Sequence, residues 1–172
     1  SMTSTRCEAW LRGPLAGVPA LLQPPAHAFV MAREDVEEAV AGLGFDQLWA
    51  RPGGVASVGL HLGHLTGSTD RLLTYARGET ISPSQFAALE AERELDRTRP
   101  SLEWLLDAWH AAVEAALQQI AATPESILLE PRVVGRGRLP STVLGLLFHS
   151  AEHAQRHTGQ IVTTAKIVRA GI

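Results

Sequence analysis

Residues 102–120 read LEWLLDAWHAAVEAALQQI and carry the clearest periodic pattern in the chain. Their large apolar side chains recur every three or four residues, which is the spacing of one face of an α-helix. Ser101 stands directly before them, and serine is one of the residue types that cap the N-terminus of a helix. The apolar stripe consists of Leu102, Leu105, Leu106, Trp109, Val113, Leu117 and Ile120. The pattern predicts an amphipathic helix that begins after Ser101 and buries one face.

Three other segments show the same helical period or the boundary signals of a helix. Proline fits the first turn of a helix and glycine often follows the last, and both residue types bound these segments. The expected helices run from Pro24 to a stop at Gly44, from Val55 to Arg77 with Gly78 as a cap, and from Pro140 and Ser141 to about Val168. Together with the helix after Ser101, they make four long helices.

The connections before the last two of these helices are long. Residues 81–100 are polar and charged, with room for one helical turn. Within residues 123–140, Pro131, Gly135 and Gly137 predict a crossover loop with a short extended pair. We therefore expect an all-α fold, a four-helix bundle with long crossover connections. A single domain should span residues 1–172, with residues 1–23 as a wrapping segment and residues 24–170 as the bundle.

The composition limits the class of protein. The chain has 172 residues, of which 45% are hydrophobic and 19% charged, and a net charge of -3, so nothing in it favours binding to nucleic acid. No apolar run approaches the ~20 residues that cross a bilayer, and the start SMTSTRCEAW lacks the pattern of a signal peptide. A cytoplasmic protein without a membrane partner is expected. Cys7 is the one cysteine, so a thiolate-rich zinc site is excluded.

Histidines concentrate on two of the expected helices. Residues 149–161 read HSAEHAQRHTGQI, so His149, His153 and His157 recur every four residues along one helix face, and His61 and His64 lie on the second helix. A lone histidine on an apolar face is usually an ordinary core residue. Burying several unpaired imidazoles costs about 1–3 kcal/mol each, however, and a divalent metal ion satisfies their ring nitrogens together. The pattern favours a metal site between the two helices.

The spacing alone does not select all of the ligands. His153 and His157 are four residues apart, which lets two imidazoles on one helix reach one ion. His61 and His64 are three residues apart and diverge by about 60° around the helix. The helical period therefore does not show which of the two faces the histidine pair on the last helix. His149 lies one turn before the pair, at the pocket wall or above the ion. A histidine pair of this spacing also occurs on ordinary surface helices, so the prediction of a metal site depends largely on the histidines of the second helix.

Two segments carry a family resemblance, namely VGLHLGHLTGSTDRLL (58–73) and RLPSTVLGLLFHSAEHAQRHTGQI (138–161). In this order they resemble the DinB-like superfamily over most of the chain, and HAQRHTGQI is the most specific part. The resemblance implies a helical bundle with one metal histidine on the second helix and a pair on the last. Carried over to this sequence, the implied metal ligands are His64, His153 and His157. It assigns no role to His61 or His149, which stay possible extra ligands or pocket residues.

Metal-binding histidines usually need a hydrogen-bond partner for the second ring nitrogen. Gln160, Glu152 and Asp70 are the candidates for this role. Gly159, next to Gln160, costs a helix ~1 kcal/mol relative to alanine, and is expected to allow close helix packing beside the site.

Three neutral histidines leave a coordination position open, as in catalytic rather than structural metal sites. Zinc and nickel both suit such a donor set. The resemblance implies a metal-dependent transferase that activates a low-molecular-weight thiol for attack on a small electrophilic substrate. Arg71, Arg138 or Arg156 could hold the carboxylates of that thiol.

Two other functions stay open on the residues alone. One is a stress-related metal-binding bundle without turnover. The other is a metal-dependent hydrolase, in which Glu152 or Asp70 would act as the general base, although the chain has no HExxH motif. A homodimer is also expected, because Trp10, Leu11 and Trp49 supply apolar area outside the periodic positions of the four helices.

Overall fold

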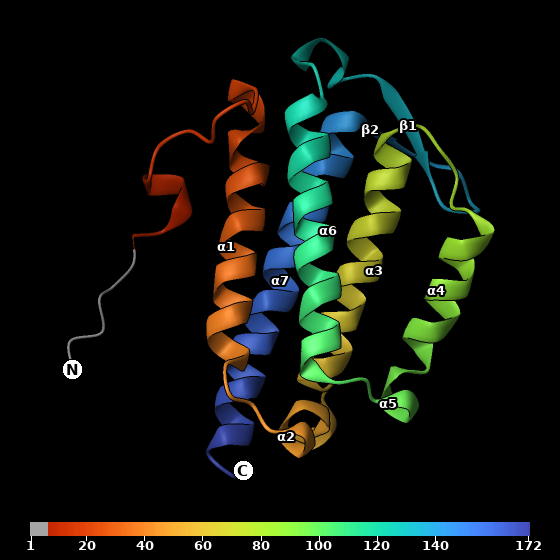
Figure 1. The fold of residues 1–172 in the computed structure, drawn as a ribbon. Helices are drawn as coiled ribbons and strands as arrows, with labels where there is room; N and C mark the ends of the chain where they lie inside the picture. The colour runs from red at the N-terminus through yellow and green to blue at the C-terminus, as the bar shows by residue number, and fades with distance from the viewer. Residues whose placement is uncertain (1–6) are drawn as a thin grey trace.

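Four long helices lie side by side in the computed structural model, which describes residues 7–172 (Figure 1). They are α1 (Gln23–Val40), α3 (Val58–Ala76), α6 (Leu102–Ala122) and α7 (Val143–Arg169). Both α6 and α7 pack against α1 and α3, so each long helix contacts two others. The core between them contains the fully buried side chains of Phe29, Leu62, Trp109 and Ile161. The chain is mostly helical with one small sheet, which confirms the expected helical class.

Side-chain caps fix where three of the long helices begin. The hydroxyl groups of Ser57, Ser101 and Thr142 accept hydrogen bonds from backbone N–H groups three residues later, at 3.0, 3.1 and 3.0 Å. The cap at Ser101 was expected from the sequence. The expected start of the last helix at Pro140 is wrong, because the cap is Thr142 and the helix begins at Val143.

The end of α1 also differs from the expectation. The helix stops at Val40, and Gly42 adopts a left-handed conformation with φ of 71°. Gly44 is instead the N-cap of a short helix, α2 (Phe45–Trp49). This helix directs the side chain of Trp49 into the core, where only 5% of the residue is exposed. The prediction that Trp49 offers exposed apolar surface is therefore wrong, whereas Trp10 and Leu11 are exposed.

Two further helices, α4 (Pro83–Arg93) and α5 (Leu95–Thr98), connect α3 to α6. The sequence predicted one helical turn here. Ser82 and Gln85 form a reciprocal capping box with Pro83 at the first turn, which explains why an eleven-residue helix starts at this point. Figure 1 shows α4 on the outer side of α3. Glycines of α3 allow both helices to approach it closely, because a Cβ atom at Gly67 would overlap Glu92 of α4 and one at Gly63 would overlap Leu95 of α5.

The small sheet is an antiparallel hairpin of β1 (Pro131–Val134) and β2 (Leu139–Thr142). It confirms the short extended pair expected within the loop after α6. Its register pairs Val134 with Leu139, so residues 135–138 form the turn. The guanidinium group of Arg132 donates a hydrogen bond to the carbonyl of Ala76 at 2.9 Å, which ties the hairpin to the end of α3.

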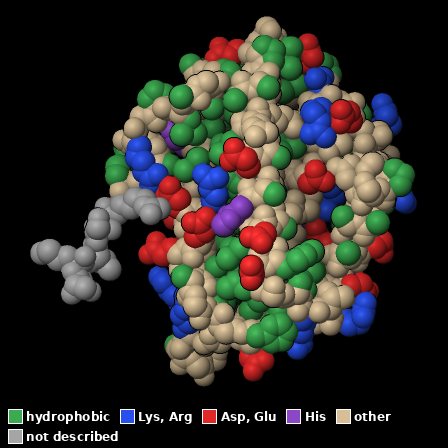
Figure 2. All heavy atoms as spheres, in the orientation of Figure 1, with side chains coloured by type: hydrophobic (Ala, Val, Ile, Leu, Met, Phe, Trp, Pro, Cys, Tyr) green, Lys and Arg blue, Asp and Glu red, His purple; other side chains and the backbone are tan. Residues whose placement is uncertain are grey.

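The segment before α1 packs along that helix. It contains the short helical turns η1 (Ala9–Leu11) and η2 (Ala20–Leu22), and the ring of buried His27 hydrogen-bonds the carbonyl of Gly13 at 2.9 Å. Two more turns, η3 (Pro52–Gly54) and η4 (Glu125–Ile127), lie in the later connections. Within residues 7–172, every helix is too short or too polar to cross a bilayer. Figure 2 shows acidic and basic side chains interspersed over one face.

We expect Gly59→Ala to destabilise the fold through Trp49. A Cβ atom at Gly59 would lie 2.7 Å from the buried indole ring, whose N–H group already donates to the carbonyl of Pro100 at 3.3 Å. Gly159→Ala is the matched control, because Gly159 is an exposed helical glycine with no atom within 4 Å of its Cβ position. The prediction that Gly159 allows close packing is therefore wrong.

Both substitutions gain the same helix propensity, so their difference isolates the packing conflict. Gly59→Ala should be less stable than Gly159→Ala by about 1–3 kcal/mol, the usual cost of overpacking. Urea unfolding followed by circular dichroism measures this difference. Equal midpoints for the two variants would contradict the assigned role of Gly59.

Candidate metal centre

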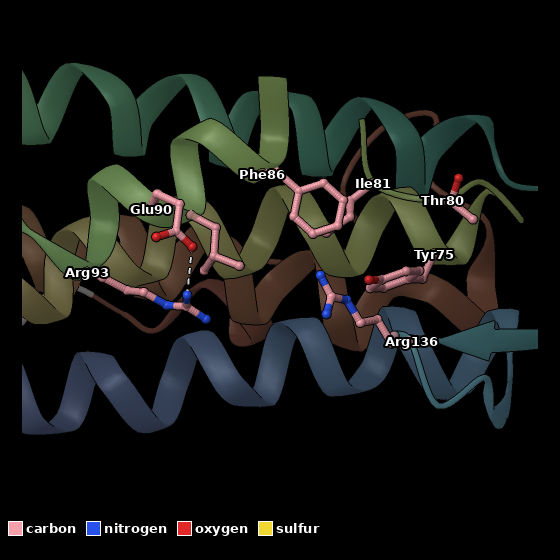
Figure 3. Close-up of a pocket in the computed structure, with 9 residues that line it drawn as sticks. Tyr75, Thr80, Ile81, Phe86, Glu90, Arg93 and Arg136 are labelled. Carbon is pink, nitrogen blue, oxygen red and sulfur yellow. Dashed lines mark hydrogen bonds and ion pairs between the residues drawn. The ribbon is translucent and has the colours of Figure 1, made fainter. Parts of the chain in front are cut away.

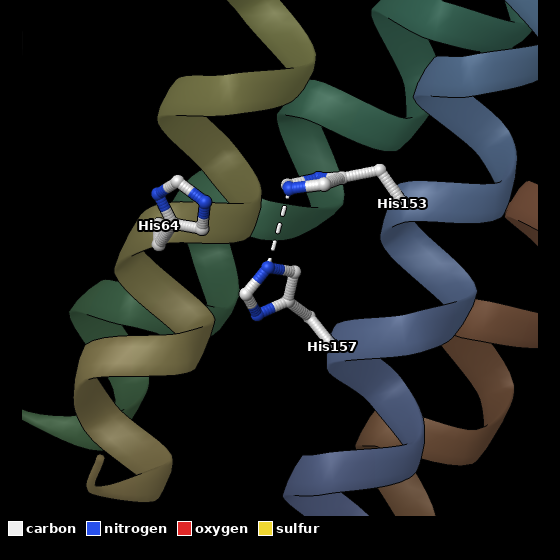
Figure 4. A group of neighbouring side chains, drawn as sticks. All are labelled: His64, His153 and His157. Carbon is white, nitrogen blue, oxygen red and sulfur yellow. Dashed lines mark hydrogen bonds between the residues drawn. The ribbon is translucent and has the colours of Figure 1, made fainter.

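Three histidines from two helices point toward one another. His64 belongs to α3, and His153 and His157 belong to α7 (Figure 4). Each offers a potential ligand atom, and these atoms all lie within 4.8 Å of one another. The ring centroid of His64 lies 4.7 Å from that of His157 and 5.2 Å from that of His153. The structure thus brings together the three histidines that the family resemblance had singled out.

The helical period explains this convergence. On α7, Ala154, Thr158 and Ile161 are buried against the other helices, and the neighbouring positions of His153 and His157 fall at the edge of that buried face, half-buried. Because α3 packs against the same side of α7, a histidine on its facing edge meets the pair. The site therefore lies where helix packing ends and solvent begins.

The Nδ1 atom of each of the three histidines has its own partner. His64 Nδ1 lies 2.9 Å from Glu92 Oε2, and His157 Nδ1 lies 2.9 Å from Nδ1 of His61. His153 Nδ1 is 3.5 Å from the hydroxyl oxygen of Ser68, a longer contact. When each Nδ1 carries the proton and donates it to this partner, every Nε2 keeps a free lone pair. This is the tautomer that a metal ligand requires.

The Nε2 atoms of His153 and His157 are already spaced for a shared ion. They lie 3.2 Å apart. Two nitrogens bound to one tetrahedral ion at about 2.0–2.1 Å are separated by about 3.3 Å. Neutral imidazoles at this spacing, with their other nitrogens paired, fit a divalent metal ion such as zinc.

Glu92, from α4, is the site residue that the sequence analysis missed. Its carboxylate accepts hydrogen bonds from His64 and, at 3.1 Å, from the guanidinium group of Arg71, and its side chain is 13% exposed. Burial by itself raises the pKa of this carboxyl group, but the hydrogen bonds from His64 and Arg71 outweigh burial and hold the pKa of Glu92 below its ordinary value. The available signal was the capping box at Ser82, which starts the helix that carries Glu92.

The other predicted site residues lie around this cluster or away from it. His61 is buried and touches His157. His149 is 46% exposed, and its Nδ1 contacts Glu152 at 2.6 Å. Glu152 also accepts hydrogen bonds from Arg156. The three candidates for orienting the metal ligands therefore lie elsewhere: Glu152 is bonded to His149 and Arg156, Asp70 accepts a hydrogen bond from Gln85 at 2.8 Å, and Gln160 is exposed.

A cavity of about 370 Å³ opens beside the histidines, so a small ligand can approach them. His61, His64 and His157 form one side of it. Glu92, Arg93 and Asp96, with Ala56 and Leu60, complete its lining. The site thus combines a converging donor set with an open approach, which is the arrangement of a metal centre that binds ligands.

The sequence profile of the DinB superfamily matches residues 28–161. The chain belongs to the DinB superfamily. This match confirms the resemblance drawn from the histidine helices, and it includes α4 as well as the three converging histidines. No curated protein matches the chain at a significant level.

Two of the three converging histidines of this DinB-superfamily site, His153 and His157, are held neutral, as is the adjacent His61. Burial, reinforced by the neighbouring histidines, lowers the pKa of His153 to about 4 and that of His157 to about 4. Burial, followed by the nearby charge of His64, also lowers the pKa of His61. Neutral imidazole is the form that binds metals, so the protein favours the metal-binding form of these histidines at neutral pH.

The lowered pKa values predict how the stability of the metal-free protein depends on pH. In the unfolded chain, His153 and His157 bind protons as the pH falls through about 6.5, whereas the folded protein resists protonation until about 4. Since the unfolded state binds more protons in this window, the free energy of unfolding should fall as the pH drops from about 6.5 to about 4. Urea unfolding with a chelator present measures this slope.

The control is the double variant His153→Gln and His157→Gln, which removes both titrating groups. It should flatten the slope in the same pH window. A slope that the double variant leaves unchanged would show that other groups cause the dependence.

Proposed function

We propose that this DinB-superfamily protein is a metal-dependent transferase that moves a low-molecular-weight thiol onto an electrophilic small molecule. The observation that carries the proposal is the open cluster of three converging histidines beside a cavity, two of which, His153 and His157, are held neutral by burial. A divalent ion held there would lower the pKa of a bound thiol and keep it in the nucleophilic thiolate form near neutral pH. The family resemblance supports a thiol rather than water.

In this proposal His64, His153 and His157 hold the ion, and zinc and nickel both suit them. Glu92 orients His64, and His61 orients His157 by accepting a hydrogen bond from its Nδ1. The four long helices would act as the rigid bundle of the DinB type. Such support matters because misplaced ligands lose metal affinity.

The transfer forms a bond between the thiol sulfur and an electrophilic carbon of the substrate. The leaving group on that carbon departs with its bonding electrons, and the thiol proton passes to solvent. The cavity beside the histidines, of about 370 Å³, has room for a small substrate next to the thiol. Its lining by Ala56 and Leu60 provides apolar contacts for the substrate.

The positions of the acidic residues favour this reaction over hydrolysis. A hydrolase needs a general base near the ion, and Glu152 and Asp70 were the candidates. Both are engaged in hydrogen bonds to other side chains. Glu92 contacts one of the three converging histidines, and its carboxylate is bound to both His64 and Arg71. A carboxylate with a lowered pKa and two donors is a poor proton acceptor.

The homodimer remains part of the proposal, now with Trp10 and Leu11 as its exposed apolar residues. Their side chains are more than half exposed, at 55% and 57%. Light scattering at micromolar concentration should give the mass of two chains, and the mass of one chain would contradict it.

We expect Glu92→Gln to weaken metal binding without unfolding the protein. Glutamine keeps the shape of the side chain but loses the charge that holds the Nδ1 proton of His64, so the affinity for zinc should fall by about 10–100-fold. Competition with a zinc-binding dye measures this affinity. The control is Glu90→Gln, which changes an exposed carboxylate on the same helix. Equal affinities for the two variants would show that Glu92 does not support the site.

The main test combines metal content with thiol transfer. His157→Ala should remove most of the bound metal and abolish transfer, because it deletes one of three ligands. His149→Ala and Cys7→Ala should retain both, since His149 faces Glu152 and Cys7 is exposed in the segment before α1. Elemental analysis measures the metal, and conjugate formation with a panel of electrophiles measures transfer of bacillithiol, mycothiol, glutathione or cysteine. Metal-loaded protein that transfers none of these thiols would refute the proposal.

A further inference from the structure

A second cavity, of about 630 Å³, lies between α4, the end of α3 and the turn of the hairpin (Figure 3). Tyr75 comes from α3, Phe86 and Leu89 come from α4, and Arg136 comes from the hairpin turn. Two consecutive helices and a hairpin turn that is distant in sequence therefore build one concave site. The rings of Tyr75 and Phe86 and the side chain of Leu89 give it mainly apolar walls, which suit the carbon skeleton of an organic ligand.

One cation in this cavity has no acidic partner. The guanidinium carbon of Arg136 lies 5.9 Å from the centroid of the Phe86 ring, and Arg136 makes no ion pair or hydrogen bond with any side chain of residues 7–172. The other arginine of the cavity, Arg93, is paired with Glu90 at 2.7 Å. Arg136 thus supplies the net positive charge here. A guanidinium fork with free N–H donors binds carboxylate and phosphate oxygens in pairs.

The second cavity adjoins the cavity beside the histidines. Arg93 lines both of them. On α4, Phe86 of the second cavity and Glu92 of the metal centre are six residues apart, which is about 9 Å along the helix axis. An elongated ligand that passes Arg93 can therefore occupy both cavities, with one end near Arg136 and the other near the histidines.

We infer that the second cavity binds the acidic end of an elongated organic acid, with Arg136 on its carboxylate or phosphate and Phe86 and Tyr75 against its apolar body. The part of this inference that places the other end of the ligand at the histidines rests on the proposed function. The sequence left Arg71, Arg138 and Arg156 as candidates for holding an acid. Arg71 is paired with Glu92 and Arg156 with Glu152. The geometry therefore favours Arg136 as the residue that binds the acidic group.

The cavity can be tested without any metal or thiol. The chain has one tyrosine, so fluorotyrosine incorporation places a single fluorine NMR probe at Tyr75, inside the cavity. Octanoate added to metal-free protein should shift this signal in a saturable way, and octanamide, which lacks the charge, should bind at least about fivefold more weakly. Arg136→Ala should weaken octanoate binding by about five- to tenfold, and Arg136→Lys should restore part of it.

Arg138→Ala is the matched control, because it removes the same charge from the same hairpin turn without altering the cavity lining. It should bind octanoate like the unchanged protein. Loss of binding in Arg138→Ala equal to that in Arg136→Ala would reduce the effect to general electrostatics and overturn the inference. So would an absence of saturable shifts, or equal affinities for octanoate and octanamide.

The link between the cavities needs cobalt-substituted protein, in which the absorption band of a cobalt–thiolate bond reports thiol binding. Mercaptooctanoate should bind about fivefold more tightly than mercaptooctanol, and Arg136→Ala should abolish this advantage. If both thiols bind equally, the ligand does not span the cavities, while the proposed function stands. If octanoate occupies the second cavity but neither thiol produces the band, the proposed function fails and the acid site stands alone.

Discussion

The carboxylate of Glu92 connects the elements around the site, because it belongs to α4 and binds two side chains of α3. It accepts hydrogen bonds from His64 and from Arg71 while mostly buried. A buried carboxylate without such partners would be costly, so its position depends on both donors. Gly67 supplies the space, since a Cβ there would overlap the carboxylate oxygen. Close packing of α4 on α3 therefore orients a histidine, and the candidate metal centre depends on a helix that contributes none of its three histidines.

The parts of this structure that the sequence predicted are those with a strong period. The stripe from Leu105 to Ile120 is buried as expected. The four-residue spacing of His153 and His157 predicted that their rings lie on the same face of one helix. By contrast, α4 has no fully buried residue, so it has no apolar stripe to detect. Its capping box was its one clear signal. Periodicity therefore reveals helices that fill the core and misses a helix that lies on the outside, even when that helix completes the site.

The choice between His61 and His64 could not come from spacing, for a geometric reason. The two residues differ by about 60° around α3, and both can face α7. Which ring reaches the pair depends on how α3 is rotated about its own axis, and packing with α4, α6 and α7 fixes that rotation. In the structure His64 lies near both rings of α7, whereas His61 lies against His157. In the proposed metal site, His61 would therefore orient His157 through its Nδ1 atom and would not bind the ion itself.

The charges near the histidines follow a single rule, in which each neighbouring arginine has a carboxylate partner. Arg71 is paired with Glu92, Arg93 with Glu90 and Arg156 with Glu152. An unpaired cation close to the site would repel a metal ion, so this pairing protects metal binding. Arg136 lacks such a partner among residues 7–172 and lies beside Phe86, which is six residues before Glu92 on α4. If the second cavity binds an acidic ligand, Arg136 would therefore supply the free positive charge that holds its acidic end, away from the histidines.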